Sequence, residues 1–235
     1  MPTINTDWWN YGGITRDVNI VEVAGTFIQD YYIQLADNDP KNIDVSIILN
    51  GSEKANQQVT VEIPAANLKT ICITDSEGKA KTTIPAKSLN LWSPENPYLY
   101  EVKLTHNSEV LADKIGFRTI QTKGSDILLN GRPVFLRGIC MHEENGVRGG
   151  RAYSREDAQM LLGWAKELGC NFVRLAHYPH NENMTRVADE MGMLVWSEVP
   201  VYWTIQWQNP DTYANAHNQL TEMITRDKNR ASVII

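Results

Sequence analysis

The stretch from Asn171 to Glu198, NFVRLAHYPHNENMTRVADEMGMLVWSE, most constrains the fold of this chain. NFVRLA is a short apolar run with one arginine, which is typical of a strand covered on both faces. Apolar residues then recur at helical spacing until Gly192, and MLVW begins a second apolar strand. The order of strand, helix and strand predicts a βαβ unit with two parallel strands.

Polar side chains follow both strands of this unit. Arg174, His177 and Tyr178 lie at or just past the end of the first strand, and Glu198 ends the second. The carboxyl ends of parallel strands face the ligand crevice of α/β folds. The sequence therefore predicts that these four side chains lie together on one functional rim.

Seven spaced residues of this stretch resemble the signature of family 2 glycoside hydrolases, which include β-galactosidases, β-glucuronidases and β-mannosidases. They are Asn171, Arg174, His177, Tyr178, Pro179, Asp189 and Gly192. Leu175 and Thr185 depart from the family pattern, which usually has a small residue and an apolar or aromatic residue there. The alternative is a satisfied polar pair of Arg174 and His177 in an unrelated α/β protein.

Length, charge and cysteine content limit the classes of protein to which this chain can belong. A chain of 235 residues predicts one or two domains. A net charge of -6 argues against a nucleic-acid partner, and no apolar run approaches the ~18 residues of a membrane span. The N-terminus lacks signal-peptide features, which fits a cytoplasmic protein, or a periplasmic one if a preceding segment carried the signal. Cys72, Cys140 and Cys170 match neither a disulfide framework nor a zinc pattern. We expect no metal and no cofactor.

Residues 24–123 alternate with period two, which predicts a disulfide-free immunoglobulin-like β-sandwich with a scaffolding role. The expected strands are FIQDYYIQL, IDVSIIL, QQVTVEI, KTICIT, YLYEVKL and KIGFRTIQT. Asn50-Gly51, Glu77-Gly78 and Asn107-Ser108 are expected turns. Residues 91–100 and 116–118 resemble the end of the corresponding domain of family 2 enzymes.

Residues 1–23 are expected to be the tail of another domain, with one strand around Val18, Ile20 and Val23. Residues 7–18 resemble the last part of the jelly-roll sugar-binding domain of family 2 enzymes. That resemblance implies that Asp7 reaches the active site and binds a sugar hydroxyl, since a carboxylate can accept two hydroxyl hydrogen bonds. Without the resemblance, an exposed turn residue is the simpler interpretation of Asp7.

Residues 124–235 alternate strands and helices, which predicts the first half of a (β/α)8 barrel. The region begins with a hairpin around Asn130-Gly131 and the strand FLRGIC. A capping box of Ser154 and Asp157 then begins a helix, and SVII is the fourth strand. The predicted fold class is thus an immunoglobulin-like β-sandwich followed by half of a (β/α)8 barrel. Four strands cannot close a barrel, so we expect open sheet edges. The result would be either self-association into a homo-oligomer or a molten half-barrel beside a firm sandwich.

The resemblance places no catalytic carboxylate in this chain. Retaining glycosidases need two carboxyl groups about 5–5.5 Å apart. Family 2 enzymes take the acid/base from an Asn-Glu pair after the fourth strand and the nucleophile from the seventh, and both positions would lie beyond Ile235. Glu198 ends a strand on the correct rim, and we expect it to support the site or contact substrate. The family's β-galactosidases bind a metal after the third strand, but SEVPVYWTIQW lacks the matching glutamate and histidine.

The remaining candidates would bind substrate. His142 and His177 resemble family residues near the reacting sugar, and a neutral imidazole offers one donor and one acceptor to a diol. Arg174 would orient a carboxylate, with a buried ion pair as the alternative. Tyr202 and Trp203, with Trp207, form either an apolar wall for a sugar or aglycone or ordinary core packing. His180 and His217 are expected on the surface.

These observations predict a fragment of a retaining β-glycosidase that binds a β-galactoside or β-glucuronide. One alternative is a non-catalytic carbohydrate-binding or scaffolding module. A second is an unrelated α/β hydrolase with a different nucleophile, although no G-x-S-x-G motif occurs.

Overall fold

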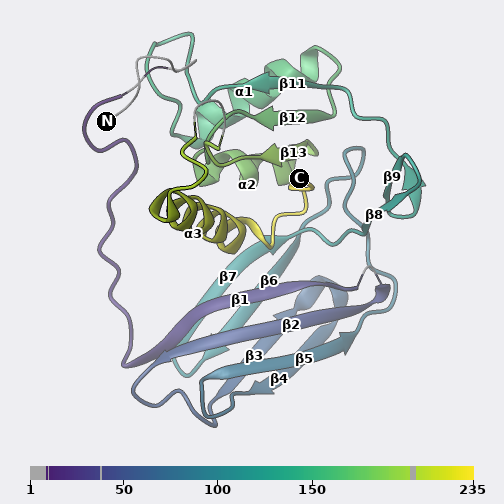
Figure 1. The fold of residues 1–235 in the computed structure, drawn as a ribbon. Coiled ribbons are helices and arrows are strands. Elements are labelled where there is room, and N and C mark those ends of the chain that lie inside the picture. The colour runs from purple at the N-terminus through teal and green to yellow at the C-terminus, as the bar shows by residue number, and fades with distance from the viewer. Residues whose placement is uncertain (1–8, 10, 38, 202–204) are drawn as a thin grey trace. The chain divides into compact units, whose positions relative to one another are not determined.

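The computed structural model describes residues 9, 11–37, 39–201 and 205–235, and its contacts divide the chain into two compact units. The sandwich unit comprises Val21–Phe135 and Lys228–Ala231. The half-barrel unit comprises the described residues of Met1–Ile20 together with Leu136–Asp227 and Ser232–Ile235. Figure 1 shows the strands and helices of each unit.

The sandwich unit contains two antiparallel sheets, with strand orders β1-β2-β5 and β4-β3-β6-β7. Buried side chains from both sheets, including Ile33, Ile47, Val61 and Leu104, form one core, as the period-two pattern predicts. This arrangement confirms the immunoglobulin-like sandwich. The strands are β1 (Thr26–Ala36), β2 (Asp39–Gly51), β3 (Gln58–Ile63), β4 (Leu68–Ile73), β5 (Lys79–Pro85), β6 (Tyr100–His106) and β7 (Glu109–Ile115), and the short 3-10 helix η1 (Pro64–Ala66) precedes β4.

Two strand predictions in this unit were wrong. Strand β5 was not predicted because KAKTTIP has few apolar residues, although Ala80 and Ile84 are buried. KIGFRTIQT is not one strand, since β7 ends at Ile115 and a separate small sheet begins with β8 (Ile120–Lys123), followed by β9 (Asp126–Leu129) and β10 (Arg132–Pro133). A Cβ atom on Gly116 would lie 2.8 Å from the ring of the buried Trp92. A glycine thus fits against this tryptophan directly after the end of β7.

The strand expected around Val18, Ile20 and Val23 is also absent from the described residues. Residues 11–25 have no strand assignment, and the side chains of Val18 and Ile20 are exposed. A strand needs a neighbour for its backbone hydrogen bonds, and the described part of the chain pairs no strand with this segment. The alternation of apolar residues alone was insufficient evidence for a strand.

The half-barrel unit contains three parallel strands in the order β11-β12-β13. Helix α1 connects β11 to β12, α2 connects β12 to β13, and α3 follows β13 (Figure 1). Val233 then forms a parallel bridge with Val195, so a fourth strand begins beside β13. This alternation confirms the predicted start of a (β/α)8 barrel. The bounds are β11 (Gly138–Met141), α1 (Arg155–Glu167), β12 (Phe172–Leu175), α2 (Glu182–Met191), β13 (Leu194–Ser197) and α3 (Pro210–Asp227).

The first strand is shorter than the FLRGIC run. It begins at Gly138, where a Cβ atom would lie 2.6 Å from the carbonyl oxygen of Phe172. Glycine thus permits the close approach of β11 to β12. Phe135, at the start of the run, is 76% exposed.

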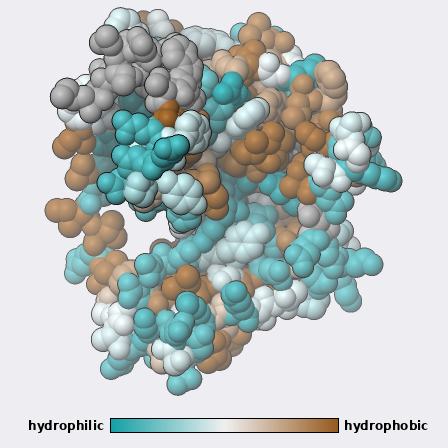
Figure 2. Space-filling view, viewed as in Figure 1, coloured by the Kyte–Doolittle hydropathy of each residue, from teal (hydrophilic) through white to brown (hydrophobic). Residues whose placement is uncertain are grey.

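The open sheet leaves apolar side chains accessible. Figure 2 shows apolar residues gathered over β13 and the C-terminal segment, where Trp196 and Ile235 are exposed. In the described part of the chain, no helix is both long and apolar enough to cross a membrane.

Helix α1 begins with the predicted capping box. The Ser154 side chain accepts from the Asp157 backbone N–H, and the Asp157 carboxylate accepts from Ser154. Burial raises the pKa of the Asp157 carboxyl, but hydrogen bonds from Tyr153, Asn145 and Arg148 lower it further, to about 2. Asp157 is thus the point that joins the loop before α1 to the helix.

His180 was expected on the surface, but it is fully buried. Its Nε2 atom donates to the carbonyl oxygen of Ala176 at 2.9 Å, and its ring stacks on Tyr178. Burial lowers the pKa of His180 to about 3, and the positive charges of Arg151 and Arg16 act in the same direction. The imidazole is therefore neutral in the folded state at neutral pH.

The Asp157→Asn substitution should destabilise the half-barrel unit by about 1–2 kcal/mol at pH 7, because it removes charge-assisted hydrogen bonds at the start of α1. Thermal unfolding of the variant and the wild type measures this difference. The difference should shrink as the pH falls from about 4 toward 2, because the wild-type carboxylate is then protonated. The Glu156→Gln control removes a charge from the same turn without the network. Equal effects of both substitutions would contradict the assignment.

The half-barrel should lose stability as the pH falls below 6.5, because the unfolded His180 takes up a proton while the folded one stays neutral until about pH 3. Between pH 7 and pH 5 the expected loss is about 2 kcal/mol, measured by hydrogen exchange of α1 and α2 amides. His180→Gln should reduce this loss. His217→Gln, at an exposed position of α3, is the control, and an unchanged pH dependence in His180→Gln would refute the prediction.

Candidate functional site

The parallel register brings three strand ends to one edge of the sheet. Met141 lies opposite Leu175, and Leu175 lies opposite Ser197. His142 follows β11 directly, His177 follows β12 after Ala176, and Glu198 follows β13. This is the edge at which ligands bind in parallel α/β folds.

Arg174 and Glu198 form the centre of this edge. The Arg174 guanidinium donates to both oxygens of Glu198, through Nε to Oε1 and through Nη2 to Oε2 at 3.2 Å. Hydrogen bonding to Glu198 raises the pKa of Arg174 above its ordinary value. The same guanidinium lies over the ring of Trp196 at 5.0 Å and within 3.9 Å of the Cys140 sulfur. Contacts on several sides therefore fix the orientation of this arginine.

His177 shares a single nitrogen between these two groups. Its Nδ1 atom lies 3.1 Å from Glu198 Oε2 and 3.2 Å from Arg174 Nη2. A protonated Nδ1 donates to Glu198, whereas an unprotonated one accepts from Arg174. In the neutral ring, Nε2 is an acceptor when Nδ1 donates to Glu198, and a donor when Nδ1 accepts from Arg174.

His142 lies beside His177 at the same edge. The two ring centroids are 5.6 Å apart in an edge-to-face arrangement, and the His142 ring lies 5.9 Å from that of Tyr178. Burial raises the pKa of Tyr178, so its phenol is neutral at pH 7. Two imidazoles beside an arginine offer the donors and acceptors that a polyol requires.

The structure brings together four of the seven predicted binding residues, namely His142, Arg174, His177 and Glu198. The other three predicted residues, Asp7, Tyr202 and Trp203, lie outside the described residues.

An apolar hollow of about 350 Å³ lies between the chain that follows Glu198 and helix α3. Val199 and Pro200, directly after Glu198, contribute to its wall. Trp207, which the sequence analysis considered for an apolar wall, lines it as well. Its lining suits an apolar group rather than a charged one.

The contacts of one group beside the site, Glu143, were not predicted from the sequence. The Glu143 carboxylate is buried and forms ion pairs with Arg16 and Arg151. Consecutive side chains of an extended chain point in opposite directions, so the position of Glu143 directly after His142 was a usable signal. Its arginine partners come from distant positions, for which the sequence contains no signal.

Metal ligation has no clear candidate among the residues that the structure describes. Their His, Cys, Asp and Glu side chains form no cluster of three that could hold a metal ion.

Comparison with known proteins identifies both units. The family model described as glycosyl hydrolases family 2, TIM barrel domain, matches residues 120–235, and the model described as glycosyl hydrolases family 2 matches residues 26–118. A β-glucuronidase of Paenibacillus borealis is 28% identical over 97% of this chain and 40% of its own length. A β-galactosidase of Leuconostoc mesenteroides is also 28% identical, over 97% of this chain and 24% of its own length.

Solved structures share the fold. The crystal structure of a β-galacturonidase from Eisenbergiella tayi bound to galacturonate is similar over 90% of this chain and 40% of its own, with a TM-score of 0.77 and 27% identity. The chain thus spans well under half the length of these relatives. Both family models and the shared fold lead to one assignment. The chain belongs to glycoside hydrolase family 2 and carries its sandwich domain and the beginning of its TIM barrel domain.

Proposed function

We propose that this chain provides the sugar-binding part of a retaining β-glycosidase active site. The observation that carries the proposal is the cluster of His142, His177 and the Arg174–Glu198 pair at the carboxyl edge of the half-barrel. The paired imidazoles would bind adjacent hydroxyls of a terminal sugar, and Arg174 with Glu198 would hold His177 in the required orientation. Relatives named as β-glucuronidase and β-galactosidase support a β-glucuronide or β-galactoside as the substrate.

Other parts of the chain have proposed roles in the same site. Residues 1–23 would end a sugar-binding jelly-roll domain, with Asp7 as a further hydroxyl ligand. The apolar hollow beside α3, together with Tyr202 and Trp203, would receive the aglycone. The acid/base and nucleophile glutamates would lie outside residues 1–235. The chain by itself would therefore bind sugar without cleaving it.

The contacts of Glu198 and Glu143 support the proposal that this chain binds sugar and does not cleave it. Glu198 accepts from Arg174 and lies within hydrogen-bond distance of His177, and Glu143 is held by two arginines. Both carboxylates therefore have partners within the protein, which supports a structural role for them rather than a catalytic one. A retaining mechanism needs two carboxyl groups that can reach that bond from opposite sides.

Sugar binding can be tested with protein that carries isotope-labelled histidine rings. Galactose or glucuronate should shift the ring signals of His142 and His177 and leave that of His217 unchanged. His177→Ala should weaken binding by about tenfold, which corresponds to roughly 1–1.5 kcal/mol for one lost hydrogen bond. His217→Ala is the matched control. Equal shifts at all three histidines would indicate non-specific association and contradict the proposed site.

The absence of hydrolysis is a separate prediction. The purified chain should release no nitrophenol from nitrophenyl β-galactoside or β-glucuronide above the rate in buffer. Measurable turnover that disappears in Glu198→Gln would assign the catalytic role to Glu198 and contradict the proposal that the chain only binds sugar. Turnover that survives the substitution would also contradict this proposal, and it would indicate that another carboxylate is catalytic.

A further inference from the structure

Glu143 is a buried carboxylate held between two arginines. Its side chain is 1% exposed, and its Oε2 atom lies 2.8 Å from Arg16 Nη2 and 2.6 Å from Arg151 Nη2. An unpaired carboxylate in such a position would be strongly destabilising. The two guanidinium groups therefore determine where Glu143, and the backbone around it, can lie.

Glu143 joins the two loops that carry the histidines. Its Oε1 atom accepts from the backbone N–H of Asn181, the residue that caps α2. Its own backbone N–H donates to the hydroxyl of Tyr178 at 3.2 Å. Glu143 follows His142 directly, and Tyr178 follows His177 directly, so the Glu143–Tyr178 contact lies one residue from a site histidine in each loop.

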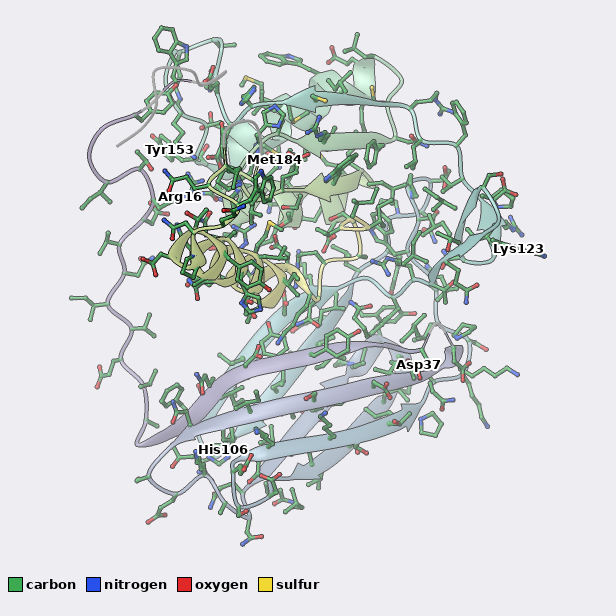
Figure 3. The ribbon with its side chains drawn as sticks, in the orientation of Figure 1. Arg16, Asp37, His106, Lys123, Tyr153 and Met184 are labelled. Atoms are coloured by element: carbon green, nitrogen blue, oxygen red, sulfur yellow. The ribbon has the colours of Figure 1, made fainter. Side chains whose placement is uncertain are left out.

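Arg16 reaches both loops from the N-terminal segment. Besides its ion pair with Glu143, its Nη2 atom donates to the carbonyl oxygen of Pro179 at 3.1 Å. Figure 3 shows the labelled Arg16 side chain pointing from the N-terminal segment toward the half-barrel elements. One guanidinium therefore contacts the loop after β11 and the loop after β12 together. Both contacts are made by the same nitrogen atom, Nη2, which carries two hydrogens and can donate one to each partner.

The N-terminal segment makes two more contacts with the loop after β11. The backbone N–H of Trp9 donates to Glu144 Oε1 at 3.3 Å, and the Arg151 guanidinium lies 6.0 Å from the centre of the Tyr11 ring. Arg151 also lies over the Tyr178 ring at 5.2 Å. The contacts of Trp9, Tyr11 and Arg16 thus follow the same loop that begins with His142.

We propose that Arg16 is a positioning residue for the sugar site. By clamping Glu143 and Pro179, it holds the loops after β11 and β12 in one relative position and so sets the spacing of His142 and His177. The ligand part of this inference rests on the proposed function, whereas the histidine spacing can be measured without any sugar. Arg151 continues to neutralise Glu143 when Arg16 is replaced, so loss of Arg16 should loosen the site without unfolding the unit.

The test compares Arg16→Met with Arg186→Met, a matched control that removes an arginine from an exposed pair with Glu182 in α2. In sugar-free protein with labelled histidines, Arg16→Met should weaken the nuclear Overhauser effect between the His142 and His177 rings and shift both signals. Hydrogen exchange should become faster at residues 142–151 and 176–183 only. Arg16→Lys should restore these properties in part, and added methylguanidinium should restore them in Arg16→Ala.

Sugar titration of the same variants forms the second arm. Arg16→Met should bind galactose or glucuronate about 3–10-fold more weakly than the wild type. The loss should be less than additive with that of Glu143→Gln, because both residues take part in the Arg16–Glu143 ion pair. If the wild type binds no sugar, the proposed function fails while the histidine measurement still decides the role of Arg16. If Arg16→Met leaves the histidine signals and exchange as Arg186→Met does, the positioning role is wrong. Thermal unfolding is recorded for each variant, and Arg16→Lys supplies the decisive comparison if Arg16→Met unfolds.

Discussion

Parallel pairing in a common register is the constraint on which the half-barrel site depends. Met141, Leu175 and Ser197 lie at the same level of the sheet, so the three segments that follow these strands leave the sheet at the same edge. The polar residues that follow the strands meet at this level, although long stretches of sequence separate them. A shift of one residue in either pairing would turn every following side chain to the other face. The close approach at Gly138 helps to exclude such a shift.

Arginine–carboxylate pairs hold the loops on this frame. Glu198 with Arg174 joins a loop to β12, and Asp157 with Arg148 joins a loop to α1. Glu143 with Arg151 joins two parts of the loop after β11. Burying an ion costs several kcal/mol unless its partner is well placed, so these pairs allow few alternative arrangements. The result is a rigid set of donors and acceptors, which lowers the entropy that a ligand must lose on binding. The site is therefore organised largely by electrostatics, while the sandwich is organised by apolar packing.

The difference between these two kinds of organisation explains what could be predicted from the sequence. Apolar periodicity is local, so it predicted most strands of the sandwich and the βαβ order, and it failed at β5, where lysine and threonine dominate. The meeting of Arg174, His177 and Glu198 followed from strand order, whereas His142 was placed near them through the family resemblance. The two ion pairs of Glu143 were not predictable in this way, because Arg16 and Arg151 reach it through tertiary contacts. His180 was placed on the surface for the same reason, since its burial depends on packing by distant residues.

The direct succession of His142 and Glu143 also restricts how this region can change during evolution. His142 lies beside His177, whereas Glu143 lies between two arginines, so one inserted or deleted residue would exchange their environments. The start of the loop after β11 should therefore keep a fixed length. Residues 146–150 of the same loop are exposed, and two of them are glycines with positive φ angles. Related proteins can vary in length there without moving the histidine, which makes this tip a natural place for new substrate preferences to arise.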